Sequence, residues 1–122
     1  MTEIIYDLEE RTALFSEGVI ALVKKYRKDN LLFPVLSQLL RAGTSVGANY
    51  REANGASSKR DFVNKIHICK KESKETEYWL RVLGDVIKEA TDECKMLNKE
   101  AHELTLIFSK IASSSKQKII EH

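Results

Sequence analysis

The sequence predicts an all-α protein, an antiparallel four-helix bundle with up-down-up-down topology. The first observation is the scarcity of residues that make tight turns, with five Gly and one Pro among 122 residues. A chain so poor in these residues must form a few long elements. The second is that apolar residues recur in alternating steps of three and four within four segments, which is the period of an amphipathic helix. Four helices with short connections bury such stripes by packing antiparallel with their neighbours. The length fits a single domain over residues 1–122.

The first helix is expected over residues 7–28. Asp7 and Glu10 have the spacing of a capping box, with Asp in place of the usual Ser or Thr. Basic residues crowd the predicted last turn, which suits the negative end of a helix dipole, before Asp29 and Asn30 interrupt the pattern. The positions with helical spacing are Leu8, Thr12, Phe15, Val19, Leu22 and Tyr26.

The second helix is expected over residues 33–54. Pro34 falls in its first turn, where a helix accepts proline because that N–H has no helical partner. The helical period stops before Gly55. Gly43 and Gly47 place small residues on one face, which allows a neighbouring helix to approach closely.

The third helix is expected over residues 59–90. Ser58 precedes it as an N-cap, and Asp61 follows at the third helical position. This helix has the longest seam with helical spacing, formed by Phe62, Ile66, Cys69, Ser73, Thr76, Leu80, Leu83 and Ile87.

The fourth helix is expected over residues 92–112. Thr91 has the position of its N-cap, and acids follow in the first turn. Residues 113–122 lose the helical period, so we expect this C-terminal tail to fray.

The composition is typical of a globular protein, with 43% hydrophobic residues, 31% charged residues and a net charge of +2. No stretch of 18 apolar residues occurs, so no membrane partner is expected. The chain starts with acids where a signal peptide has a basic start and an apolar run, so we expect a cytoplasmic protein. Cys69 and Cys94 fit no metal-ligand spacing and are expected to be reduced core residues.

The sequence offers no cluster of residues that would bind a metal or another cofactor. His67, His102 and His122 do not lie three or four positions from one another or from a cysteine. A zinc site or a Cys-His nucleophile needs such converging groups, and a phosphate-binding loop needs clustered glycines that the chain lacks. We therefore expect no metal and no cofactor.

Asn49 and Glu52 are a polar pair near the apolar seam of the second predicted helix. They lie one turn apart, so they could be partly buried, with Arg51 or Arg60 as their hydrogen-bond partners. An active site built on them is the alternative, but a lone acid without a paired base or metal rarely makes a catalytic centre. A nuclease would need a carboxylate cluster for two metals or a pair of histidines. The sequence predicts a protein that is not an enzyme.

The charges are unevenly distributed along the chain. Residues 51–81 hold eight basic and five acidic residues, a net charge of +3. Within the third predicted helix, His67, Lys74, Arg81 and Lys88 recur every seven residues. Such a stripe favours binding to a phosphate backbone, and the alternative is a solvated face without a partner. The candidate nucleic-acid-binding residues are Lys59, Arg60, Lys65, Lys70, Lys71, Lys74 and Arg81.

Several apolar residues lie outside the predicted seams, namely Leu14, Val23, Ile68, Trp79, Val82, Val86 and Ile107. They indicate a second interface and therefore a homo-oligomer. The alternative is that they widen the stripe that faces the core of one bundle.

Three segments, residues 37–53, 57–62 and 70–76, resemble a family of bacterial four-helix-bundle proteins encoded in intervening sequences of large-subunit ribosomal RNA genes. The accessory proteins of diversity-generating retroelements are similar. The family motif reads approximately Ser-Ile-x-x-Asn-Ile-Ala-Glu-Gly, and Ser45, Asn49 and Glu52 fall at its positions. Arg51 stands where the motif has Ala, and Ala53 stands where it has Gly. The last difference could alter the end of the second helix.

The resemblance implies an antiparallel four-helix bundle, assembled as a homopentamer around a central channel and without an established enzymatic activity. It also implies partners, since the retroelement relatives associate with nucleic acid and a reverse transcriptase. The leading hypothesis is an oligomeric bundle that binds RNA or DNA through its basic stripe. The alternative is a structural scaffold for a protein such as a reverse transcriptase or a ribosomal component.

Overall fold

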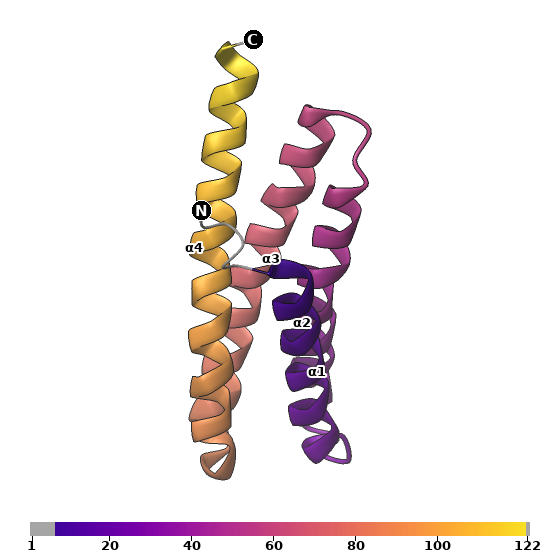
Figure 1. Ribbon diagram of the computed structural model, residues 1–122. Helices are drawn as coiled ribbons and strands as arrows, with labels where there is room; N and C mark the ends of the chain where they lie inside the picture. The colour runs from indigo at the N-terminus through magenta and orange to yellow at the C-terminus, as the bar shows by residue number, and fades with distance from the viewer. Residues whose placement is uncertain (1–6, 122) are drawn as a thin grey trace.

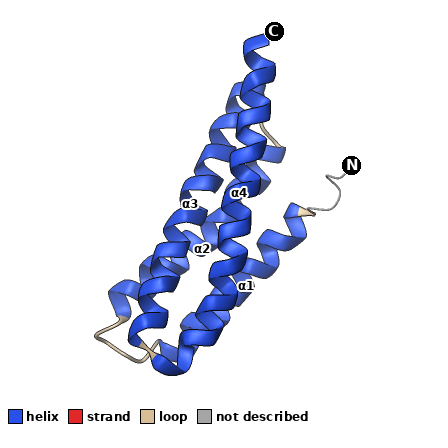
Figure 2. Ribbon diagram, turned by 90° about the vertical axis from the view of Figure 1, so that its left-hand side faces the viewer, coloured by secondary structure: helices blue, strands red, loops and turns tan. Residues whose placement is uncertain are grey.

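The protein is an up-and-down bundle of four helices, as the sequence predicts. The structure, a computed structural model, describes residues 7–121, with side chains described to residue 115. The helices are α1 (Leu8–Tyr26), α2 (Phe33–Asn54), α3 (Lys59–Val86) and α4 (Thr91–Glu121), with a short 3₁₀ helix, η2 (Lys88–Ala90), before α4. Each long helix runs antiparallel to the one before it (Figure 1). Figure 2 shows helices and loops over the described residues and no strand.

The helix α3 is the centre of the packing. It lies along both α2 and α4, whereas α1 packs mainly on α2 and touches α4 less extensively. The lengths differ, since α1 has 19 residues and α4 has 31. In Figure 1, α4 therefore extends past the connection between α2 and α3. Over residues 7–121, no helix is long and apolar enough to cross a membrane.

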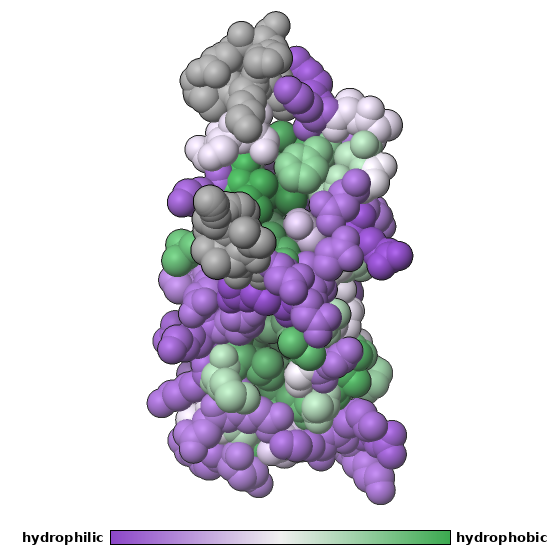
Figure 3. Space-filling view, in the orientation of Figure 1, coloured by the Kyte–Doolittle hydropathy of each residue, from purple (hydrophilic) through white to green (hydrophobic). Residues whose placement is uncertain are grey.

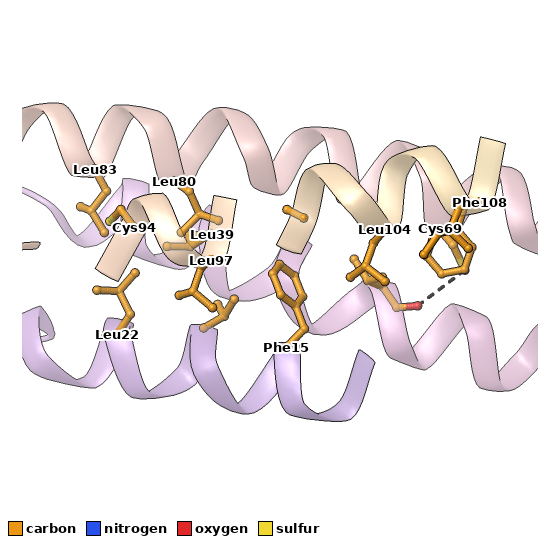
Figure 4. Close-up of a cluster of buried hydrophobic side chains, with 14 of the residues drawn as sticks. Phe15, Leu22, Leu39, Cys69, Leu80, Leu83, Cys94, Leu97, Leu104 and Phe108 are labelled. Atoms are coloured by element: carbon orange, nitrogen blue, oxygen red, sulfur yellow. Dashed lines mark hydrogen bonds between the residues drawn. The ribbon is translucent and has the colours of Figure 1, made fainter. Parts of the chain in front are cut away.

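The predicted seams form the core. Figure 4 shows side chains from all four helices meeting in one buried cluster, including Phe15, Leu39, Leu80 and Phe108. Cys69 and Cys94 are free thiols, as expected, and both are buried. Burial raises the pKa of Cys69 to about 12 and that of Cys94 to about 11, which keeps both thiols protonated.

The helix starts agree with the sequence at two positions and differ at a third. Ser58 Oγ accepts a hydrogen bond from the Asp61 N–H at 3.0 Å, as an N-cap does. Pro34 lies at the start of α2. The capping box at Asp7 is wrong, because this residue has a left-handed backbone (φ 38°) and its carboxylate makes no cap hydrogen bond.

The predicted end of the third helix at residue 90 is also wrong. The helix α3 ends at Val86, Ile87 is extended, and η2 precedes α4. The helical period did not reveal this turn, because Ile87 and Ala90 stay buried within it. Thr91 starts α4 itself, and its hydroxyl donates to the Gly84 carbonyl at 2.8 Å instead of capping the helix.

The other ends differ by smaller amounts, except at the C-terminus. The helix α1 ends at Tyr26, two residues before the predicted end. The expected fraying of residues 113–122 is not seen over residues 113–121, since α4 continues to Glu121, and His122 lies outside the described residues. This segment contains no Gly or Pro, so nothing in it interrupts the backbone hydrogen bonds of a helix.

Candidate nucleic-acid interface

One face of α3 carries exposed basic side chains. The helix turns its apolar seam towards α2 and α4, so the opposite positions face solvent. Lys71, Lys74 and Arg81 are exposed on that face, and Tyr78 lies among them with 58% of its surface accessible. Lys59 and Arg60 are exposed in the first turn, and Lys70 is half-buried. We call Lys59, Arg60, Lys70, Lys71, Lys74 and Arg81 the basic stripe.

Two acids of α3 lie on the flank that faces α2. Arg41 Nη1 lies 3.2 Å from Glu72 Oε1, and Arg41 Nη2 lies 2.6 Å from Glu75 Oε2. The hydrogen bond from Arg41, with a second from the Trp79 indole, holds the pKa of Glu75 below its ordinary value. Both carboxylates therefore have a cationic partner outside α3.

Another acid of α3, Glu77, lies on the flank that faces α4. Its Oε2 accepts a hydrogen bond from Thr105 Oγ1 at 2.6 Å, and its Oε1 lies 3.2 Å from His102 Nδ1. Asn98 donates to the Glu77 backbone carbonyl at 2.7 Å and supports the same contact between the helices. The position of Glu77 is therefore set by hydrogen bonds with α4.

The basic stripe has few acidic partners of its own. Among residues 7–115, the one ion pair that involves it joins Arg81 and Asp85 at 3.9 Å, and both side chains are more than 70% exposed. Exposed pairs of this kind contribute little to stability and are readily exchanged for another anion. The sequence predicted the excess charge, and in the structure Lys59, Arg60, Lys71, Lys74 and Arg81 are exposed to solvent.

Two residues predicted for the stripe lie elsewhere. Lys65 faces α2, where its Nζ lies 2.8 Å from Glu52 Oε1 and this contact raises the pKa of Lys65. Lys88 falls in η2, so the seven-residue repeat of the stripe ends at Arg81. The seven-residue repeat did not predict the turn at Ile87, where the extended backbone takes the chain out of the helical register.

The polar residues of the family motif are used locally. Ser45 Oγ donates to the Arg41 carbonyl at 2.7 Å, and Asn49 Nδ2 donates to the Ser45 carbonyl at 2.9 Å. Glu52 is exposed and pairs with Lys65, so the expected partners Arg51 and Arg60 are wrong. Arg51 itself is exposed on α2. These contacts do not bring a nucleophile, a base and a carboxylate together at one place.

A groove of about 600 Å³ lies between α3 and α4, beside the basic stripe. Arg81 and Tyr78 line it from α3, and Lys95, Lys99 and His102 line it from α4. Sequence reasoning missed Lys95 and Lys99 because it considered the charges of one helix at a time. Their spacing of four, which places two residues on one helix face, was the available signal. Over the part of the chain with described side chains, no group of three or more potential ligands could hold a metal ion.

Together, the fold and this surface define a class of protein: a small antiparallel four-helix bundle with a basic face on its third helix. Residues 7–110 match the family described as 23S rRNA-intervening sequence protein. The chain belongs to this family, as the sequence motifs indicated.

A solved structure supports the same assignment. It is a protein of unknown function from the S23 ribosomal protein family of Bacteroides thetaiotaomicron VPI-5482, with 34% sequence identity to this chain. The alignment covers 85% of this chain and 96% of the other, with a TM-score of 0.79. Among curated proteins, no match to this chain was found.

Proposed function

We propose that this protein is a non-enzymatic, oligomeric bundle of the cytoplasm that binds the backbone of RNA or DNA through the basic stripe on α3. The observation that carries the proposal is the separation of charge on this helix. Glu72, Glu75 and Glu77 lie on its flanks with partners from α2 and α4, while the lysines between them face solvent. Among residues 7–115, the one ion pair of this row of cations is therefore the exposed contact between Arg81 and Asp85.

A phosphate backbone suits such a row for a physical reason. Each phosphate that a lysine or arginine neutralises releases condensed counterions, and this release favours binding without any contact to a base. Lys71, Lys74 and Arg81 are exposed on one helix, where a phosphate backbone can reach them. The polar residues of the family motif support the non-enzymatic part of the proposal, since Asn49 and Glu52 are engaged in structural contacts.

Exposed apolar side chains on α1 and α4 support assembly into an oligomer. Leu14 is 56% exposed, Met96 is 67% exposed and Leu106 is 56% exposed. Figure 3 shows hydrophobic patches between the hydrophilic bands of one face of the molecule. Contact between copies would cover such surface, and symmetry would repeat the basic stripe around the assembly. A pentamer is the assembly implied by the resemblance described above.

The test is a titration of labelled duplex RNA and duplex DNA by fluorescence anisotropy at about 50 and 200 mM salt. The stripe variant carries Lys71→Glu, Lys74→Glu and Arg81→Glu. We expect the unmodified protein to bind both duplexes and to lose affinity steeply as salt rises. The stripe variant should bind far more weakly, and each lost phosphate contact should lower the slope of log affinity against log salt by about 0.9.

A control of equal charge separates a local effect from a general one. Lys24→Glu, Arg27→Glu and Lys28→Glu change the net charge by the same amount in the last turn of α1 and the connection after it, outside α3. This variant should keep most of the binding. Absence of binding by the unmodified protein at low salt would overturn the proposal. If the oligomer forms normally without any binding, the protein is a scaffold.

A further inference from the structure

We propose that the groove between α3 and α4 holds an unpaired segment of nucleic acid, with Tyr78 as the stacking platform for a base and Arg81, Lys95 and Lys99 as the phosphate contacts. This inference rests on the proposed function and narrows it, because it selects single strands over duplexes. The ligand chemistry is a single-stranded phosphodiester chain, which can come from RNA or DNA.

Cations line both walls of the groove. On α3, Tyr78 lies three positions before Arg81 and four after Lys74, so the ring is flanked by positive charge along one helix face. On α4, Lys95 and Lys99 line the opposite wall and are separated by about 6 Å along the helix axis. A strand in the groove would meet positive charge from two directions.

Acidic residues in the groove are either held by α4 or weakly paired. Glu77 is engaged with Thr105 and His102, so its carboxylate has donors other than solvent. Asp85 is 73% exposed and lies 3.9 Å from Arg81, which leaves the arginine able to exchange this partner for a phosphate. Within residues 7–115, the two groove lysines of α4, Lys95 and Lys99, form no ion pair.

Tyr78 has the properties of a stacking platform. The residue is 58% exposed, and its ring contacts the Trp79 ring edge-on, with centroids 4.9 Å apart and planes at 73°. The Trp79 indole in turn donates to Glu75 Oε2 at 3.1 Å. The neighbour that contacts Tyr78 is therefore held in place, and the exposed ring is available to a base.

An exposed aromatic ring among cations distinguishes single strands from duplexes. Single-strand binders combine a basic groove with aromatic side chains on which bases stack, and such stacking tolerates any sequence. In a duplex the bases are already stacked and paired, so the Tyr78 ring gains nothing from them. The groove should therefore add affinity for single strands beyond what the basic stripe supplies to both forms.

The experiment measures anisotropy with labelled oligouridylate and oligothymidylate of about 12 nucleotides, each beside a duplex with the same number of phosphates. The variants are Tyr78→Ala and Tyr78→Phe, used as the full chain. We expect Tyr78→Ala to weaken single-strand binding about tenfold or more, with duplex binding unchanged. Tyr78→Phe should keep the affinity because it keeps the ring. Circular dichroism checks that both variants fold, which their exposed position favours.

A second pair of variants tests the α4 wall. Lys95→Gln with Lys99→Gln should weaken single-strand binding and lower its salt slope by about 1.4, or about 0.7 for each contact. The matched control is Lys24→Gln with Lys28→Gln, which removes the same charge at the same sequence spacing from the last turn of α1 and the connection after it, and should have little effect. Tighter binding of oligouridylate than of oligothymidylate would identify RNA as the ligand of the groove. Equal binding of the two would support contacts to phosphate and base alone, without a contact to the sugar.

The outcomes separate this inference from the proposed function. If Tyr78→Ala binds single strands as tightly as the unmodified protein, while the stripe variant has lost binding, the groove inference is overturned and the proposed function stands. If the unmodified protein binds neither single strands nor duplexes at low salt, both are overturned.

Discussion

The close contact between α1 and α2 at Gly43 leads to a quantitative prediction. A Cβ atom added at Gly43 would lie 2.9 Å from both Cγ atoms of Val19 and 3.2 Å from its Cβ. Real Cβ atoms essentially never come this close to another heavy atom, so one of the groups must move. Val19 is fully buried, and its branched side chain is restricted to one main rotamer in a helix. It therefore has little room to yield.

Two opposing effects determine the stability of Gly43→Ala. Overpacking of a well-filled core typically costs about 1–3 kcal/mol, whereas Ala in a helix is favoured over Gly by about 1 kcal/mol. The free energy of unfolding should therefore fall by up to about 2 kcal/mol. In the background of Val19→Ala the obstructing methyl groups are absent, so the same substitution should be neutral or stabilising. The expected coupling between Val19 and Gly43 is about 1–3 kcal/mol.

The assay is urea unfolding followed by circular dichroism, at one protein concentration, for the unmodified protein, the two single variants and the double variant. Gly55→Ala is the matched control, because a Cβ there would meet only the Glu52 carbonyl oxygen at an ordinary 3.8 Å. Its effect should add to that of Val19→Ala within about 0.5 kcal/mol. Additivity between Val19→Ala and Gly43→Ala would refute the packing argument.

Three further predictions follow from the described contacts. Burial raises the pKa of Cys69 to about 12 and that of Cys94 to about 11, so a thiol reagent should modify neither residue at pH 8 until urea unfolds the chain. The free energy of unfolding should also fall as pH rises above about 9, because the thiols ionise there in the unfolded chain but not in the folded one. Rapid labelling of the folded protein would contradict this. Ser58→Ala should lower the free energy of unfolding by about 1 kcal/mol through loss of the α3 cap, measured in urea, whereas Ser58→Gly should cost only a few tenths. Arg41→Ala should raise the pKa of Glu75, measured by NMR titration. Because the pKa of Glu75 is lowered in the folded protein, its pair with Arg41 stabilises the fold at neutral pH, and this stabilisation is lost as pH falls below about 4. An unchanged titration of Glu75 would exclude the pair.

The helices themselves follow from local information. Ser58 caps α3 because its hydroxyl needs only the Asp61 N–H three residues away, and Pro34 starts α2 because its ring suits the first turn of any helix. Such interactions lie within one or two turns, so a reader of the sequence can find them. Asp7 is the exception, because the same residue spacing formed no cap once its backbone was left-handed.

The end of α3 shows where local information fails. Ile87 and Ala90 continue the apolar period, but they are buried in the turn towards α4 and not in a longer helix. A buried turn needs apolar residues as much as a buried helix does. The period therefore could not separate the two, and Lys88 was assigned to a stripe that it does not join.

The sequence by itself determined the four helices, their buried seams, and the excess of positive charge between residues 51 and 81. Tertiary structure alone decided which charges remain available to a partner. Arg41 neutralises Glu72 and Glu75, and Thr105 holds Glu77, and each of these contacts joins residues 28 or more positions apart in the chain. It also brought Lys95 and Lys99 beside Tyr78 and Arg81 to form one groove. Periodicity describes the faces of a single helix, whereas ion pairs and grooves depend on which face of another helix lies opposite.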